Sequence, residues 1–192
     1  MAEFDIESAE GDLIDLPPEL ETDWIVLGSL AITSGTVAIG DSSYPVDAKS
    51  MKLANGTYAV AVRQYSKDGA TYNTRLRVSS RTRYDYDCNI ASYGIDSSSV
   101  LVADGSIERA YRRLSPEGRD SFFERCLAVT LHSELPSEFT RLPIAWVVAT
   151  GHGDGLYDIF SLIADEQLVG YETVFIGADP PTLRPRPKRV LP

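Results

Sequence analysis

One short segment of the sequence, residues 151–155, combines side chains that can do chemistry. It reads Gly151-His152-Gly153-Asp154-Gly155, and its alternate glycines permit positive φ angles and a close approach of the backbone to a ligand. An imidazole and a carboxylate two residues apart make His152 and Asp154 candidate catalytic residues, able to shuttle a proton or hold a ligand. The whole segment is a candidate ligand-binding loop. The alternative is a tight connection between strands, in which Asp154 accepts hydrogen bonds from the amides of its own turn.

Three further carboxylates follow short apolar runs and stand where predicted strands end. They are Asp41, Asp96 and Asp104. Carboxylates that converge at strand ends can hold a divalent metal or polarise a water molecule. We therefore count these three aspartates with residues 151–155 as candidate ligand-binding residues. No cofactor is expected, with a divalent metal as the alternative. For each aspartate the competing interpretation is an Asx turn that ends a strand.

The familiar signatures of catalytic and nucleotide-binding loops do not match these residues. No Gly-Lys-Ser/Thr follows residues 151–155, and no helix is predicted to begin there, which argues against a Walker loop and a dinucleotide fingerprint. A calcium loop needs more acids at alternate positions. Hydroxyls are present at Ser42, Ser43 and 97–99, but none lies in a Gly-x-Ser-x-Gly elbow, so nucleophilic catalysis is disfavoured.

The elements that must position these residues are mostly strands. Apolar, β-branched and aromatic runs predict strands at 24–33, 36–39, 57–65, 71–80, 100–103, 144–150, 156–163 and 169–176. An Asp-Gly at 68–69 predicts a hairpin, and Ser115 followed by Pro116 predicts the start of a helix after a shorter helical stretch from Ile107. Strands, then helices, then strands favour an α+β, mainly β fold. We expect an antiparallel β-sandwich or curled sheet with one or two flanking helices.

Charge divides the 192-residue chain into three parts. The formal net charge is −10, but residues 1–23 hold nine acids and no base, and residues 180–192 hold four bases and no acid. The predicted organisation is an acidic N-terminal arm (1–23), a single β-rich globular domain (24–179) with a helical insertion at about 105–132, and a basic Pro-rich tail (180–192).

Composition narrows the environment and the partners. No apolar run approaches the ~18 residues of a transmembrane helix, and the acidic N-terminus has no basic, apolar signal segment. Two separated cysteines, Cys88 and Cys126, indicate reduced thiols in a cytoplasmic protein. The acidic balance argues against direct nucleic-acid binding. The arginines and tyrosines at 75–77 and 81–86 are interpreted as a solvated strand face rather than a phosphate-binding stripe.

Three stretches resemble an uncharacterised bacterial domain-of-unknown-function family. They are 34–41, then 93–96 with 100–104, and 151–157, the last matching a late Gly-x-Gly-Asp-Gly-x-Tyr hairpin. Asp158 departs from the small residue or proline that the pattern has at that position. The resemblance implies a shared β-rich fold and a common role for Asp41, Asp96, Asp104 and Asp154. It transfers no reaction.

These observations favour a non-catalytic cytoplasmic binding protein. An immunity or antidote protein, or another conflict-system protein, fits the size, the acidity and the lack of a catalytic signature. Its expected partner is a toxin or other basic protein, reached through protein–protein contact, with no membrane involved. The alternative is an enzyme or a metal- or ligand-binding domain whose pocket gathers His152 and the aspartates at 41, 96, 104 and 154. A structural or virion-associated component is the third class.

Overall fold

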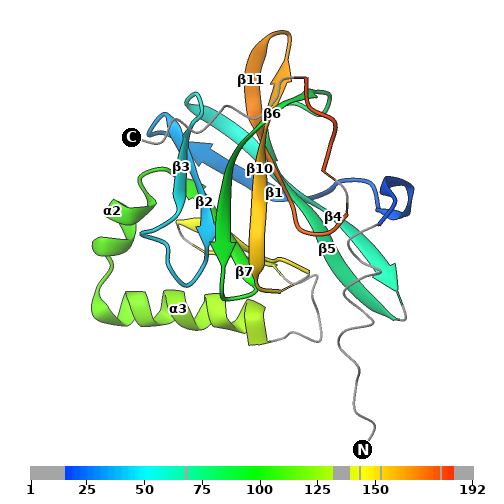
Figure 1. Cartoon of the computed structure of the whole chain (residues 1–192). Helices are drawn as coiled ribbons and strands as arrows, with labels where there is room; N and C mark the ends of the chain where they lie inside the picture. Colours follow the sequence, from blue (N-terminus) through cyan, green and yellow to red (C-terminus); the bar gives the residue numbers. More distant parts are fainter. Residues whose placement is uncertain are drawn as a thin grey trace, which may run out of the picture.

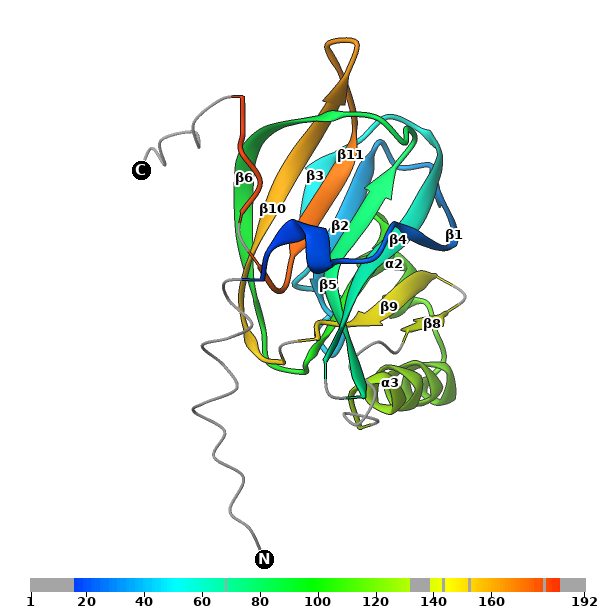
Figure 2. The same ribbon diagram turned by 90° about the vertical axis from the view of Figure 1, so that its right-hand side faces the viewer.

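Two antiparallel sheets form the body of the protein. The computed structural model describes residues 16–67, 69–131, 139–142, 144–151, 153–177 and 179–183. One sheet holds β1 (Ile25–Ile32), β4 (Gly56–Lys67), β5 (Ala70–Ser79), β6 (Asp85–Ile95), β10 (Gly155–Ala164) and β11 (Gln167–Val174). The other holds β2 (Thr36–Asp41), β3 (Lys49–Lys52), β7 (Ser99–Asp104), β8 (Phe139–Arg141) and β9 (Ala145–Ala149). The spatial orders are β1-β4-β5-β11-β10-β6 and β3-β2-β7-β9-β8 (Figures 1 and 2).

The main core lies between the sheets, because alternate side chains of each strand point to opposite faces. In β7, Val100 and Val102 belong to the cluster that both sheets share, whereas Leu101 and Ala103 belong to a second cluster. All four side chains are fully buried. The five-stranded sheet is thus covered on both faces, which explains why its strands read as continuous apolar runs.

Two helices cover the outer face of the five-stranded sheet. They are α2 (Ile107–Arg112) and α3 (Pro116–Leu131), which follow β7 in the chain (Figure 1). Ser115 caps α3, since its Oγ accepts the backbone N–H of Gly118 at 3.1 Å. Phe122 and Cys126 of α3 are buried against this sheet. None of the helices in the described part of the chain is long and apolar enough to cross a membrane.

The predicted fold class is confirmed: the described part of the protein is mainly β, with 54% strand and 14% helix, in two antiparallel sheets with two helices. Every predicted strand is present, but the sequence did not predict β3, β6 or β8. The longest of these, β6, begins in a charged stretch. Its pairing with β10 also shifts register near Phe160, so alternation between its two faces is interrupted.

Chain segments near both ends of the described residues lie against the six-stranded sheet: the segment before β1 crosses its outer face, and residues 179–183 run beside its edge strand β6 (Figure 2). Leu16 is buried, and a 3-10 turn, η1 (Pro18–Leu20), leads to Thr22, whose N–H donates to the carbonyl of Gln64 at 2.8 Å. From the other end, the N–H of Leu183 donates to the carbonyl of Tyr86 at 2.8 Å. Residues from Leu16 onward therefore pack against the domain, although the sequence predicts that the domain begins at residue 24.

A buried carboxylate, that of Glu172 on β11, lies at the centre of this outer face and is fully inaccessible to solvent. Arg75 Nη1 donates to Glu172 Oε1 at 3.2 Å, and the hydroxyls of Tyr86 and Tyr84 donate to Oε1 and Oε2 at 2.8 and 3.1 Å. Burial raises the pKa of Glu172, although Tyr86 and Arg75 oppose that rise. Burial also raises the pKa of Tyr84 and of Tyr86, so both phenols remain hydrogen-bond donors.

Glu21 extends this network to the N-terminal segment. Its carboxylate accepts hydrogen bonds from Arg75 Nε at 2.9 Å and from Arg63 Nη1 at 3.1 Å, and its side chain is 1% exposed. The guanidinium of Arg77 lies 4.0 Å from the centre of the Trp24 ring. The interpretation of this stretch as a solvated face is therefore wrong for Arg75 and Arg77, which are 5% and 4% exposed.

Replacing Glu172 with alanine should destabilise the protein by about 3–5 kcal/mol, because it leaves a buried guanidinium and two phenols without their acceptor. Urea unfolding at pH 7 measures the change. The control is Glu124→Ala, which removes an exposed glutamate from α3. Equal unfolding midpoints for the two variants would show that the Glu172 network does not support the fold.

Candidate functional site

The loop at residues 151–155 lies against the turn between β6 and β7. Asp154 Oδ1 accepts hydrogen bonds from both the N–H and the hydroxyl of Ser98, each at 2.9 Å. The N–H of Thr150 donates to the carbonyl of Ser98 at 3.0 Å. Asp154 thus binds an amide of the neighbouring turn. His152 lies outside the described residues, so its predicted role stays a prediction.

Two glycines of this loop have positive φ, 73° at Gly151 and 93° at Gly153. A Cβ on Gly151 would lie 2.1 Å from the carbonyl oxygen of Asn73, so the loop approaches the backbone of β5 too closely for any side chain. Thr150 Oγ1 accepts the N–H of Gly153 at 3.0 Å, and the Tyr157 hydroxyl donates to the Gly153 carbonyl at 2.7 Å. The loop thus lies against β5 at Gly151 and is hydrogen-bonded to its own flanking residues at Gly153.

Asp41 binds the same β6–β7 turn from the end of β2. Its carboxylate accepts the N–H of Asp96 at 2.6 Å, and both the N–H and the hydroxyl of Ser97 at 3.1 and 2.6 Å. It also accepts the N–H of Ser43 at 2.7 Å. Asp41 is 7% exposed, whereas the side chain of Asp96 is exposed. The structure brings Asp41, Asp96 and Asp154 to one corner, where two of them act as hydrogen-bond acceptors.

Asp104 lies at the opposite end of β7, a six-residue strand that spans roughly 16 Å. Its carboxylate accepts the N–H groups of Thr33 and Ser34 at 2.6 and 2.9 Å, and both the N–H and the hydroxyl of Ser106 at 2.9 and 2.5 Å. Burial raises the pKa of Asp104, but hydrogen bonds from Ser106, Thr33 and Ser34 outweigh burial and lower it. Asp104 is therefore ionised and joins the turns at this end.

The four described candidate aspartates line three different cavities. Asp41 and Asp96 line one of about 240 Å³, Asp104 another of about 240 Å³, and Asp154 one of about 320 Å³. No group of three His, Cys, Asp or Glu side chains among the described residues is arranged to hold a metal ion. The largest of these cavities shares only Asp154 and Gly155 with the candidates predicted from sequence.

This largest cavity is acidic, and sequence reasoning missed two of its carboxylates. Asp154, Asp158 and Asp179 all line it. Burial and the charge of Asp158 raise the pKa of Asp179, while Arg75 opposes the rise, so the two carboxylates act on each other. Leu156 lines the same cavity and is 77% exposed. For the two missed carboxylates, the only sequence signal was Asp158, which departs from the pattern of the resembled family.

Neither cysteine lines any of the three cavities described above. Cys88 and Cys126 are buried and free of disulfides. Burial raises the pKa of Cys126 to about 12, although Ser42 and Arg125 oppose the rise, so its thiol stays protonated and unreactive.

Alanine substitutions at the two loop glycines should separate backbone strain from collision. Gly153→Ala should cost about 1–2 kcal/mol for a side chain at positive φ, since a Cβ there meets nothing closer than 3.6 Å. Gly151→Ala should lose a further ~1–3 kcal/mol from contact with the Asn73 carbonyl. Thermal or urea unfolding measures both variants. Equal losses would mean that the loop moves freely away from β5.

The Asp104 carboxylate should make stability depend on pH. Asp104→Asn should lose about 2 kcal/mol at pH 7, because an amide cannot accept all the hydrogen bonds of the carboxylate. Since the folded pKa is below the unfolded one, this contribution is complete above pH ~4 and is lost as the pH falls below that value. Urea unfolding at pH 7, 5 and 3 should show the difference from the unsubstituted protein shrinking, with Asp120→Asn as an exposed control. A difference independent of pH would contradict the ionised carboxylate.

A scan against protein-family models and searches of curated proteins and of solved structures found no match to this chain. The likeness of residues 34–41, 93–96 with 100–104, and 151–157 to a bacterial domain family therefore stays a prediction from those residues. Function has to be inferred from the chemistry of the described side chains.

Proposed function

We propose that the protein is a non-catalytic binding protein that recognises a basic surface of another protein. One observation carries the proposal: three carboxylates and an exposed leucine line the same cavity at the start of β10. Asp154, Asp158 and Asp179 supply negative charge, and Leu156 supplies apolar surface. A lysine or arginine flanked by an apolar side chain has the complementary chemistry.

The cavity keeps acceptors available for such a cation. Asp154 uses Oδ1 for Ser98, and its Oδ2 has no hydrogen-bond partner among the described residues. The carboxylate of Asp179 also makes no hydrogen bond to the part of the chain described here. Charge-assisted hydrogen bonds from a guanidinium or ammonium would occupy both. Burial of Leu156 would add about 1.5–3 kcal/mol to the association.

The same geometry gives less support to a metal-dependent enzyme. Asp41 and Asp104 each accept at least four hydrogen bonds from the protein itself, which occupy the oxygens that a metal would need. Their roles are to hold turns. An immunity or antidote protein acting in the bacterial cytoplasm, with a basic toxin as partner, is the kind of binding protein that we propose. Eight of the nine acids of residues 1–23 add to its attraction for such a partner, since the ninth, Glu21, is buried against Arg75.

Affinity capture followed by titration tests the proposal. The protein, immobilised, should retain a basic protein from an extract of the cells that produce it, and the purified pair should bind more weakly as salt rises from about 0.1 to 0.5 M. The double variant Leu156→Ala/Asp179→Asn should weaken the affinity by roughly tenfold or more. The matched control is Leu168→Ala/Asp165→Asn, which removes the same groups from the far end of the β10–β11 hairpin.

Two outcomes would overturn the proposal. One is a partner that binds the double variant and the control variant equally well, which would place its contact elsewhere. The other is a specific partner whose affinity does not change with salt.

A further inference from the structure

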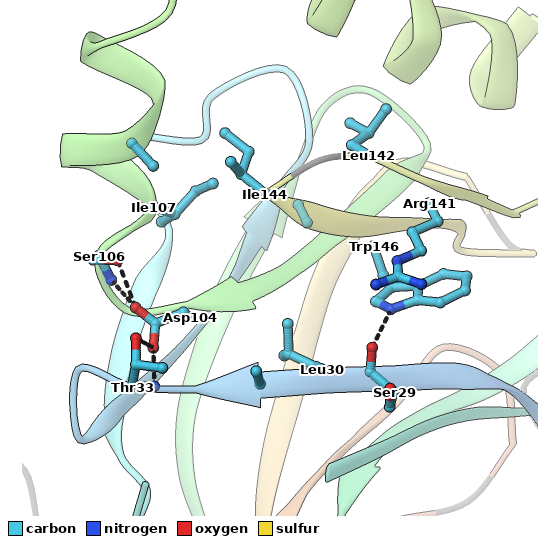
Figure 3. A pocket seen from close by; sticks show the side chains of 13 residues that line it. Ser29, Leu30, Thr33, Asp104, Ser106, Ile107, Arg141, Leu142, Ile144 and Trp146 are labelled. Carbon is cyan, nitrogen blue, oxygen red and sulfur yellow. Dashed lines mark hydrogen bonds between the residues drawn. The ribbon is translucent and has the colours of Figure 1, made fainter. Parts of the chain in front are cut away.

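A second cavity, of about 240 Å³, lies at the open edge of β1 and shares no lining residue with the acidic cavity (Figure 3). Residues 29–31 of β1 form one wall, and residues of α2 and β9 lie opposite. Leu30, Ile107 and Ile144 lie between its two ends, with Asp104 and Thr33 at one end and Arg141 and Trp146 at the other. The cavity is an apolar slot with a polar group at each end.

The edge of β1 directs backbone groups into this slot. β1 is the first strand of its sheet, and among the described strands it pairs only with β4. Trp146 Nε1 donates to the carbonyl of Ser29 at 3.1 Å, and Asp104 Oδ2 accepts the N–H of Thr33 at 2.6 Å. Because alternate residues of a strand direct N–H and C=O to the same side, Ala31 directs both groups toward the slot as well. An edge strand whose N–H and C=O groups are unpaired can hydrogen-bond to a further strand.

The open part of this edge is short. Trp146 already occupies the carbonyl of Ser29, and Asp104 already occupies the N–H of Thr33. Only the residue opposite Ala31 can therefore exchange both hydrogen bonds with β1. A long strand passing through would lose its pairing at each of the two occupied positions. Two or three residues at the end of a chain fit this window without that loss.

The charge at the Trp146 end indicates which end of a chain fits. The guanidinium of Arg141 lies 5.8 Å from the centre of the Trp146 ring, and its side chain makes no hydrogen bond or ion pair with any described residue. Asp104, at the opposite end, is already satisfied by the N–H and O–H donors of Thr33, Ser34 and Ser106. The slot therefore lacks a negative charge at Arg141. A terminal carboxylate supplies one, and Arg binds carboxylates through paired hydrogen bonds.

We propose that this slot binds the last two or three residues of an extended chain of a partner protein. The peptide adds antiparallel to β1, exchanges two backbone hydrogen bonds with Ala31, and places its free carboxylate on Arg141. The antiparallel direction follows because Arg141 lies beside Ser29, toward the start of β1. A small apolar side chain of the peptide rests on Ile107 and Ile144. This interaction is separate from the basic surface proposed for the acidic cavity.

Peptide titration tests the carboxylate. The probes are two pools of labelled hexapeptides with randomised last three residues, one ending in a free carboxylate and the other in an amide. The free-acid pool should bind the full chain, and the amidated pool should bind at least roughly tenfold more weakly. Arg141→Ala should cause a similar loss for the free-acid pool, whereas Arg83→Ala, which removes an exposed arginine outside the lining of the slot, should not. Equal binding of the two pools, or none up to about 1 mM, would overturn the proposal.

The backbone contribution is tested by Ala31→Pro. Proline removes the N–H that is directed into the slot, and an edge position tolerates this loss when the N–H is not bonded within the sheet. Peptide binding should fall at least roughly tenfold, with the thermal unfolding midpoint unchanged. In the unsubstituted protein, the Ala31 amide should exchange slowly with solvent deuterium only when peptide is bound. Strong destabilisation by Ala31→Pro would show that this N–H pairs with β4, and dimerisation of the protein without peptide binding would assign the edge to a second copy; either result overturns the proposal.

Discussion

A carboxylate buried without access to water constrains the whole six-stranded sheet. Glu172 lies on the face of the sheet that points away from the main core, where solvent would normally satisfy a charge. Burying that face requires donors from other strands, and Arg75, Tyr84 and Tyr86 provide them from β5 and from the start of β6. The guanidinium of Arg75 is shared between two carboxylates, because it also forms an ion pair with Glu21. The segment before β1 therefore crosses the outer face of this sheet, where it brings Glu21 to Arg75 (Figure 2).

The aspartates at strand ends have a related constraint. A sandwich whose strands change sheets at tight corners has to satisfy the amides that those corners leave unpaired. Asp41 and Asp154 do so at one end of β7, and Asp104 does so at the other. Asp41 and Asp104 are consequently committed to the fold, whereas Asp154 uses only Oδ1 in this way. Asp154 also lines the cavity beside Leu156, together with Asp158 and Asp179.

Local patterns in the sequence predicted the strands, the β4–β5 hairpin and the cap of α3, because each depends on residues close together in the chain. The partners of the charged side chains were not predictable in the same way. Asp104 binds Thr33 from 71 residues away, and Asp154 binds Ser98 from 56 residues away. Arg75 and Arg77 looked like a solvated face because alternation indicates which side of a strand a residue occupies, but not what covers that side. β6 was missed where charge and bulges break the period of two.

The two side chains that interrupt the edge of β1 also bear on how the protein avoids aggregation. An eight-residue strand with a free edge is long enough to pair with the same strand of another molecule, and such pairing can propagate into fibres. Trp146 and Asp104 occupy the backbone groups on either side of Ala31. Between these two positions, what remains open is too short to template an extended ladder. The protein therefore keeps an exposed strand edge without presenting a continuous surface for self-association.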